Sequence, residues 1–187
     1  MISKDSKTSK GVWFWSKAPT PYFRTVHFGV KKNQVYYIRI TDCSPTSIWN
    51  ESEVKYEDIG TLKWTNKAVT NIKYGKTKKK AVTIKKNKAK NGVIKAGSRK
   101  AQWYKINVNK KNVKIYLTSK KNCGKINATI YYRAYGSYGK WMTSKIYAYR
   151  DGSYYGRELY GGNKIKRVYI KVTPGYKTSG AYKLKWK

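Results

Sequence analysis

The stretch Arg167–Trp186, RVYIKVTPGYKTSGAYKLKW, decides the fold of this 187-residue chain. Apolar residues alternate with cations or tyrosine along Val168–Val172, and they do so again along Tyr182–Trp186 after a Pro-Gly and a Ser-Gly step. Alternation with a period of two, bounded by glycine and proline, predicts two half-buried β strands joined by a short connection. One face of each strand is therefore expected to enter a core.

The same pattern recurs upstream of this pair. Further strands are expected at Val82–Lys86, Gly92–Ala96, Gln102–Val108, Val113–Thr118, Ile126–Arg133, Ser144–Arg150 and Tyr154–Tyr160. The residues between them have turn composition, as at Asn109–Asn112 and Gly161–Asn163. Many short strands at such spacing are typical of a sandwich or barrel. The expected fold class is all-β, an antiparallel β-sandwich of the jelly-roll kind.

The inward face of each expected strand defines a core. Its expected members are Tyr104, Ile106, Val108, Val113, Ile115, Leu117, Ile126, Ala128, Ile130, Val168, Ile170, Val172, Tyr182, Leu184 and Trp186.

An internal repeat divides the chain. Tyr37–Thr41 (YIRIT) aligns without a gap with Tyr169–Thr173 (YIKVT), and the same shift brings Phe28-Gly29 onto Tyr160-Gly161. Residues 11–65 thus resemble the second half of the unit that residues 81–187 form in full. We expect a partial sandwich repeat and linker over 1–75, followed by a complete sandwich module over 76–187. A half unit would leave apolar residues such as Tyr36 and Ile38 poorly covered.

The composition points to strands and to an anionic partner. The chain has 43 Lys and Arg against 8 Asp and Glu, a formal net charge of +35, and its 19 Tyr and 7 Trp supply the apolar surface. After Asp58 the only acids are Asp151 and Glu158, so the charge belongs mainly to the later part of the chain. Such a surface attracts polyanions such as anionic polysaccharide, cell-wall polymer, anionic lipid or nucleic acid.

Several motifs together resemble a known family. They are GVIKAG (Gly92–Gly97), AQWYKINV (Ala101–Val108), NVKIYL (Asn112–Leu117), NATIYY (Asn127–Tyr132) and the C-terminal stretch quoted above. These segments resemble the bacterial pre-peptidase C-terminal domain, over residues 92–186 and in part over 13–64. The resemblance implies an eight-stranded sandwich that serves as an accessory module of secreted peptidases and other surface proteins.

What the resemblance implies for function is an extracellular, non-catalytic module on a secreted or cell-surface protein. Met1–Lys10 has no apolar segment of the signal-peptide type, so the chain is expected to be cytosolic or a fragment of a longer secreted protein, and the resemblance favours the fragment. Some relatives bind calcium through carboxylates and some bind collagen. Calcium needs several oxygen ligands, and with only two acids after Asp58 no ligand set carries over.

Residues with catalytic chemistry are scarce. The single histidine, His27, lies in an apolar stretch expected to be a strand, with no triad or metal set around it. Cys43 and Cys123 are too few for a disulfide framework, and whether they pair stays open. No enzyme activity, metal or cofactor is expected.

The aromatic surplus supplies the candidate ligand residues. Trp103 and Tyr131 are expected on outward strand faces, together with Tyr116 and Tyr169. The segment AYGSYGKW adds Tyr135, Tyr138 and Trp141, and Tyr154 and Tyr155 flank another loop. Aromatic rings beside cations can stack on sugars, polypeptide or unpaired bases. Tyrosine is also a strand former that packs on the pleat, so both interpretations of the strand tyrosines stay open.

Two classes of function remain. The first is an extracellular binding module that attaches to anionic cell-wall polymer, glycan or protein. The alternative is a basic, nucleic-acid-binding β protein, favoured by a pI near 10.1 and by interleaved Tyr and Lys. Lysine is spread over nearly every expected strand, and no recognition motif is present, which favours the first class.

Overall fold

The structure is a computed structural model in which every regular element is a β strand over the described part of the chain. It describes residues 2–3, 27–38, 65, 67–70, 72–120, 123–133, 140–148, 154–175 and 178–187, with the backbone alone at 2–3, 110, 154–155 and 160–164. The all-β fold class expected from the alternation is confirmed.

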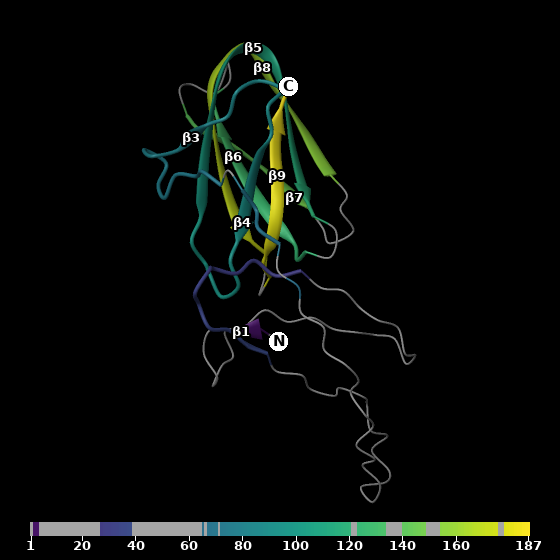
Figure 1. The fold of residues 1–187 in the computed structure, drawn as a ribbon. Coiled ribbons are helices and arrows are strands. Elements are labelled where there is room, and N and C mark those ends of the chain that lie inside the picture. The colour runs from purple at the N-terminus through teal and green to yellow at the C-terminus, as the bar shows by residue number, and fades with distance from the viewer. Residues whose placement is uncertain are drawn as a thin grey trace, which may run out of the picture.

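Nine strands lie in the described part of the chain (Figure 1). They are β1 (Ile2–Ser3), β2 (Tyr37–Ile38), β3 (Val82–Thr83), β4 (Lys90–Ile94), β5 (Gln102–Ser119), β6 (Ile126–Tyr132), β7 (Met142–Ala148), β8 (Tyr154–Pro174) and β9 (Gly180–Trp186).

Strands β3 to β9 form one hydrogen-bonded sheet that folds over on itself into two layers. Layer 1 contains β3, the first half of β5, the second half of β8, β6 and β7. Layer 2 contains β4, β9, the second half of β5 and the first half of β8. All these pairs are antiparallel except β3 with β5. Figure 1 shows β5 and β8 curving over together at the top of the molecule, where one layer continues into the other.

Two expected turns are wrong, and the error explains the bend. Asn109–Asn112 lies inside β5, and Gly161–Asn163 lies inside β8, instead of separating pairs of strands. The β5–β8 register shifts twice between Asn107 and Asn112, with extra residues on each strand in turn. Such bulges bend a strand and increase its twist. The turn-forming residues therefore mark the corner where both strands pass from one layer to the other.

The expected core is confirmed in full. Each of its fifteen side chains is at most 6% exposed, and they belong to one cluster between the layers. The burial pattern of β9, with every second residue buried, is the period-two alternation expected from Tyr182–Trp186. The structure adds seven core residues that the alternation did not include: Ile84, Ile94, Tyr132, Ile146, Ala148, Leu159 and Ile165.

A buried hydrogen-bond chain joins the two layers inside this core. The hydroxyl groups of Tyr104 in layer 1 and Tyr182 in layer 2 lie 2.8 Å apart. The Tyr182 hydroxyl donates to Oε1 of Gln102, and Nε2 of Gln102 donates to the carbonyl of Val93 at 2.7 Å. Position 92 must be glycine, because a Cβ there would overlap the Tyr182 ring that covers it. The four groups satisfy one another where water is excluded.

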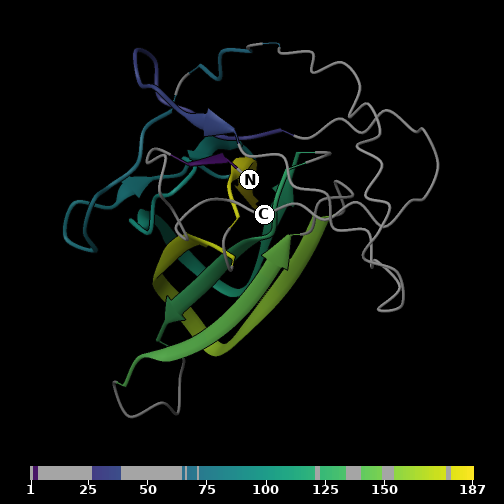
Figure 2. The ribbon, with the colours of Figure 1, turned by 90° about the horizontal axis from the view of Figure 1, so that it is seen from below.

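The described N-terminal residues lie at the end of the sandwich away from the bend (Figures 1 and 2). Gly29 accepts a hydrogen bond from the Ala96 amide at 2.7 Å, and its own amide lies 3.4 Å from the Ser179 hydroxyl. Phe28 and Tyr36 pack against Ala96, whereas Ile38 is 41% exposed. Tyr36 therefore packs against a residue of the sandwich, and the half unit over residues 11–65 stays a prediction.

The two aligned copies differ in local conformation where both are described. Residues 32–33 form a turn, with a positive φ of 56° at Asn33, whereas the aligned positions 164–165 lie in β8. Among the aligned residues that are described in both copies, Tyr37 and Ile38 alone are in a strand in both. The amide of Lys31 donates to the Tyr36 hydroxyl at 2.9 Å across this turn. The division at residue 75 stays a prediction.

We expect Tyr182→Phe to lower the free energy of unfolding by about 1–3 kcal/mol, because it leaves buried Gln102 Oε1 without its donor. The matched control is Tyr147→Phe in β7, whose ring lies on the outer face and which should change stability by less than about 0.5 kcal/mol. Urea unfolding of both variants measures the difference. Equal effects would show that the buried hydrogen-bond chain between the layers does not contribute to the free energy of unfolding.

Stability should also fall at high pH because of Tyr104. Burial raises the pKa of Tyr104 from 10.0 to about 12. Above pH 10 the unfolded chain releases this proton first, so the folded state binds more protons and loses stability as the pH rises. The contribution is complete below pH 10 and is lost between pH 10 and 12. We expect a steeper loss in the wild type than in Tyr104→Phe, measured by urea unfolding at constant ionic strength. Parallel pH profiles would contradict this.

Candidate functional site

The outer face of layer 1 places aromatic and cationic side chains side by side. The strand register aligns Lys105 of β5 with Tyr169 of β8, and Tyr169 in turn with Tyr131 of β6. In the neighbouring row Trp103 of β5 faces Lys171 of β8. All five positions alternate with core residues, so the strand pleat itself turns them outward. Each ring thus has a cation as a neighbour on the sheet.

Four rings from four segments meet on this face. Trp103 and Tyr131 stack with ring centroids 5.7 Å apart and planes at 27°. Trp141, which directly precedes β7, contacts Tyr169 edge to face at 5.5 Å and 62°. We call Trp103, Tyr131, Trp141 and Tyr169 the aromatic face. Both distances lie in the range where aromatic pairs attract beyond simple burial.

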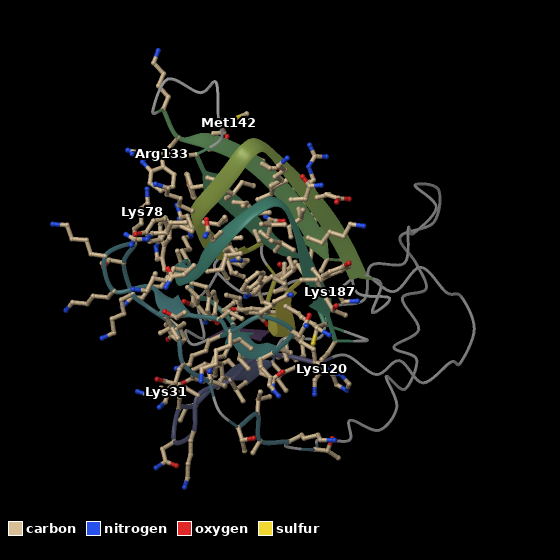
Figure 3. All side chains as sticks on the ribbon, turned by 90° about the horizontal axis from the view of Figure 1, so that it is seen from above. Lys31, Lys78, Lys120, Arg133, Met142 and Lys187 are labelled. Atoms are coloured by element: carbon tan, nitrogen blue, oxygen red, sulfur yellow. The ribbon has the colours of Figure 1, made fainter. Side chains whose placement is uncertain are left out.

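Three cations lie over these rings. Nζ of Lys78 is 3.8 Å from the ring centroid of Trp141, 5.0 Å from that of Tyr169 and 5.5 Å from that of Tyr131. The Arg133 guanidinium is 4.9 Å from the Trp141 centroid, and Nζ of Lys171 is 5.8 Å from a ring centroid of Trp103. Figure 3 shows Lys78 and Arg133 on one side of the molecule, apart from Lys187. All these distances are within the roughly 6 Å range of cation–π attraction.

The loop that carries Lys78 is fixed at both ends. Gly75 and Trp103 exchange two backbone hydrogen bonds of 2.9 Å, and the amide of Ala81 donates to the Lys78 carbonyl at 3.3 Å. Position 75 requires glycine, because a Cβ would overlap the backbone of Lys80. The chain leaves the sheet beside Trp103 and returns at β3 beside Tyr104, which places Lys78 next to the aromatic face.

The electrostatic field of this face is positive. Among the residues that the structure describes, Glu158 is the one acidic side chain, and it pairs with Lys114 in layer 2 at 3.3 Å. The described part of the aromatic face and its surroundings therefore offers cations with no carboxylate between them. Such a face attracts anions and carries flat apolar surfaces on which a ligand can lie.

The predicted site residues fall into three groups. Trp103, Tyr131 and Trp141 are brought together, and the outward-facing Tyr169 joins them. Tyr154 and Tyr155 begin β8 opposite Thr118 and Leu117, in layer 2 and away from the aromatic face. Tyr135 and Tyr138 lie outside the described residues. Lys78 and Arg133 were not predicted, because nothing in a lysine-rich sequence distinguishes one cation that contacts rings from the others.

Other reactive groups do not gather with this face. His27 is exposed and lies outside the strands, contrary to the expected strand position. Cys123 is a buried thiol whose Sγ accepts from the Ala181 amide at 3.3 Å, and burial raises its pKa. Over the described ranges, no three His, Cys, Asp or Glu side chains come together as metal ligands would. A hollow of about 340 Å³ is lined by Lys73, Ala89, Lys90 and Asn91, which come from outside the aromatic face.

No family model matches the sequence, and no curated protein matches it. Among solved structures, the chain is similar to the pre-peptidase C-terminal domain of a collagenase from Bacillus anthracis, at 20% identity and a TM-score of 0.40. The match covers 57% of this chain and 93% of that one. It names the family that the strand motifs of residues 92–186 resemble. In the described residues, no helix has the length and apolar character needed to cross a membrane.

We expect Gly75→Ala to displace the Lys78 loop, since the new Cβ meets backbone that cannot move aside as a side chain can. Exchange of the Trp103 amide, which donates to the Gly75 carbonyl, should become faster, and unfolding should cost about 1–3 kcal/mol less. Hydrogen exchange and urea unfolding measure the two effects. Gly156→Ala is the control, because its Cβ meets only the edge of the Tyr116 ring at 3.2 Å. Unchanged exchange at Trp103 would mean that the loop is not fixed at Gly75.

Proposed function

We propose that this protein is a non-catalytic extracellular binding module that attaches to anionic polymer of a bacterial cell surface, with the aromatic face as its contact. The observation that carries the proposal is that aromatic rings and cations lie together on one side of layer 1. Four rings and three cations meet there, and no acidic side chain is among the described neighbours. The family resemblance of the strand motifs supports the extracellular setting.

Charged side chains and aromatic rings contribute differently to such a contact. A net charge of +35 draws any polyanion to the surface and gives fast, unselective association that salt weakens. Flat rings add contacts that salt does not screen, about 1–3 kcal/mol for each stacked group if they resemble base stacking. A polymer of acidic sugars offers both partners at once, with anionic groups for the lysines and C–H faces for the rings.

Single-stranded nucleic acid is the competing partner. Base stacking needs ring faces that are open to successive bases. On the aromatic face Trp103 is stacked on Tyr131, and Trp141 is engaged by Tyr169 and Lys78. The lysines are also distributed over the outer faces of both layers instead of along one groove. Occupied ring faces limit stacking on bases and on sugars alike, so the spread of the lysines over both layers is the feature that favours the glycan-like polymer.

The test compares two pairs of substitutions that remove equal charge from opposite faces. Lys105→Gln with Lys171→Gln changes layer 1, and Lys183→Gln with Lys185→Gln changes layer 2. Retention on Gram-positive cell walls, heparin and single-stranded DNA is measured across a salt series. We expect the layer 1 pair to leave the wall at lower salt than the layer 2 pair.

A third variant, Trp103→Ala, keeps the charge and removes a ring. We expect it to lose the salt-resistant part of wall retention, by about a factor of ten for each 1.4 kcal/mol of stacking. Absence of wall retention at low salt would refute the proposal. Equal effects of the two lysine pairs would mean that the net charge alone holds the protein to the wall, with no particular contact face. Salt-resistant retention on DNA alone, lost in Trp103→Ala, would establish the nucleic-acid alternative.

A further inference from the structure

One cation on the aromatic face is surrounded by three rings. Tyr131, Trp141 and Tyr169 all lie within 5.5 Å of Nζ of Lys78, measured to the ring centroids. We call these three residues the cage. Several aromatic rings around one ammonium group form the arrangement by which proteins recognise quaternary ammonium ligands. Here the position of the ligand is taken by a lysine of the same chain.

The cage walls are held independently of their occupant. Tyr131 and Tyr169 are direct register partners on β6 and β8, and Trp141 packs edge to face on Tyr169. Lys78 belongs to the loop between Gly75 and β3, outside the strands. Its four-carbon stem can swing away without breaking a strand pair. The structure thus contains a preformed cation site with a removable occupant.

The surroundings restrict which cation can replace Lys78. Arg133 lies over Trp141, and Lys171, two residues from Tyr169 along β8, lies over the neighbouring Trp103, so a simple cation is repelled. A ligand with an anionic group beside its ammonium avoids this repulsion, because the same cations then bind the anion. A lysine ammonium is also strongly hydrated, whereas a quaternary ammonium is less costly to desolvate against rings.

We propose that the cage binds the quaternary ammonium of a phosphocholine group, and that Arg133 and the displaced Lys78 bind its phosphate. The group can belong to a decorated surface polymer or to a lipid headgroup. The inference goes beyond attachment by charge, because it depends on the cage and not on the net charge of the chain. The substitutions that remove rings from the cage leave that charge unchanged.

The first experiment titrates the full chain with phosphocholine, phosphoethanolamine, choline and inorganic phosphate, followed by calorimetry and tryptophan fluorescence. Phosphocholine should bind about tenfold more tightly than phosphoethanolamine, which has the same phosphate but a primary ammonium. Trp141→Ala, at a side chain that is 37% exposed, should remove this preference. Tyr147→Ala is the control, since Tyr147 has Lys125 over its ring at 4.6 Å but lies outside the cage.

The second experiment empties the cage. Lys78→Ala removes the internal competitor and one repelling charge, so choline alone should bind this variant more tightly than the wild type by about tenfold. The double variant Lys78→Ala with Trp141→Ala should lose that gain. No gain for choline, or a phosphocholine affinity equal to that of phosphate, would overturn the proposal.

Two further ligands distinguish the two sources of the phosphocholine group. Sedimentation with phosphatidylcholine vesicles tests the lipid headgroup, and retention on phosphocholine-substituted dextran tests a decorated polymer. Retention that soluble phosphocholine displaces and that Trp141→Ala abolishes identifies the source and supports the cage. Retention on neither, under conditions where the wild type is folded, would overturn it.

Discussion

The pairing of β5 with β8 is the constraint on which the whole structure depends. The two strands stay hydrogen-bonded from Gln102 and Val172 at one end to Thr118 and Tyr154 at the other, through the corner between the layers. Each layer is therefore built on the same two strands, and neither can form without fixing the start of the other. The core and the buried Tyr104–Tyr182 contact fill the space that this folded pair encloses. Trp103 and Tyr169 of the aromatic face also lie on these strands, so their relative position depends on the same pairing.

The sequence predicted the core well because burial follows a rule that is local in sequence. Alternation along Tyr104–Val108 or Tyr182–Trp186 assigns each residue to a face without knowledge of its partner strand. The two turns were predicted wrongly for the opposite reason. Asn109–Asn112 and Gly161–Asn163 have turn composition, yet pairing between strands that are distant in sequence keeps both segments extended with bulges. Local composition located the irregularity correctly but could not distinguish a bend inside a strand from a reversal of the chain.

The sequence predicted the candidate site in part, and the part that it missed has a physical cause. Outward positions on strands follow from the same alternation, which is why Trp103, Tyr131 and Tyr169 could be assigned to outer faces. Their meeting with Trp141 depends on the order of strands in the sheet, which alternation does not give. Lys78 could not be singled out, since its position depends on how the loop after Gly75 returns to β3. Ligand binding by Tyr135, Tyr138, Tyr154 and Tyr155 stays a prediction.

The position of β9 has a mechanical consequence. This strand lies between β4 and β5 and is aligned antiparallel with both, with five register pairs on each side. A force applied along β9 loads both rows of hydrogen bonds in shear, so they must break together and not one after another. Forced unfolding is governed by the unfolding rate, which such a geometry slows. A module whose strand β9 is under tension would therefore oppose the pull with both rows of hydrogen bonds at once.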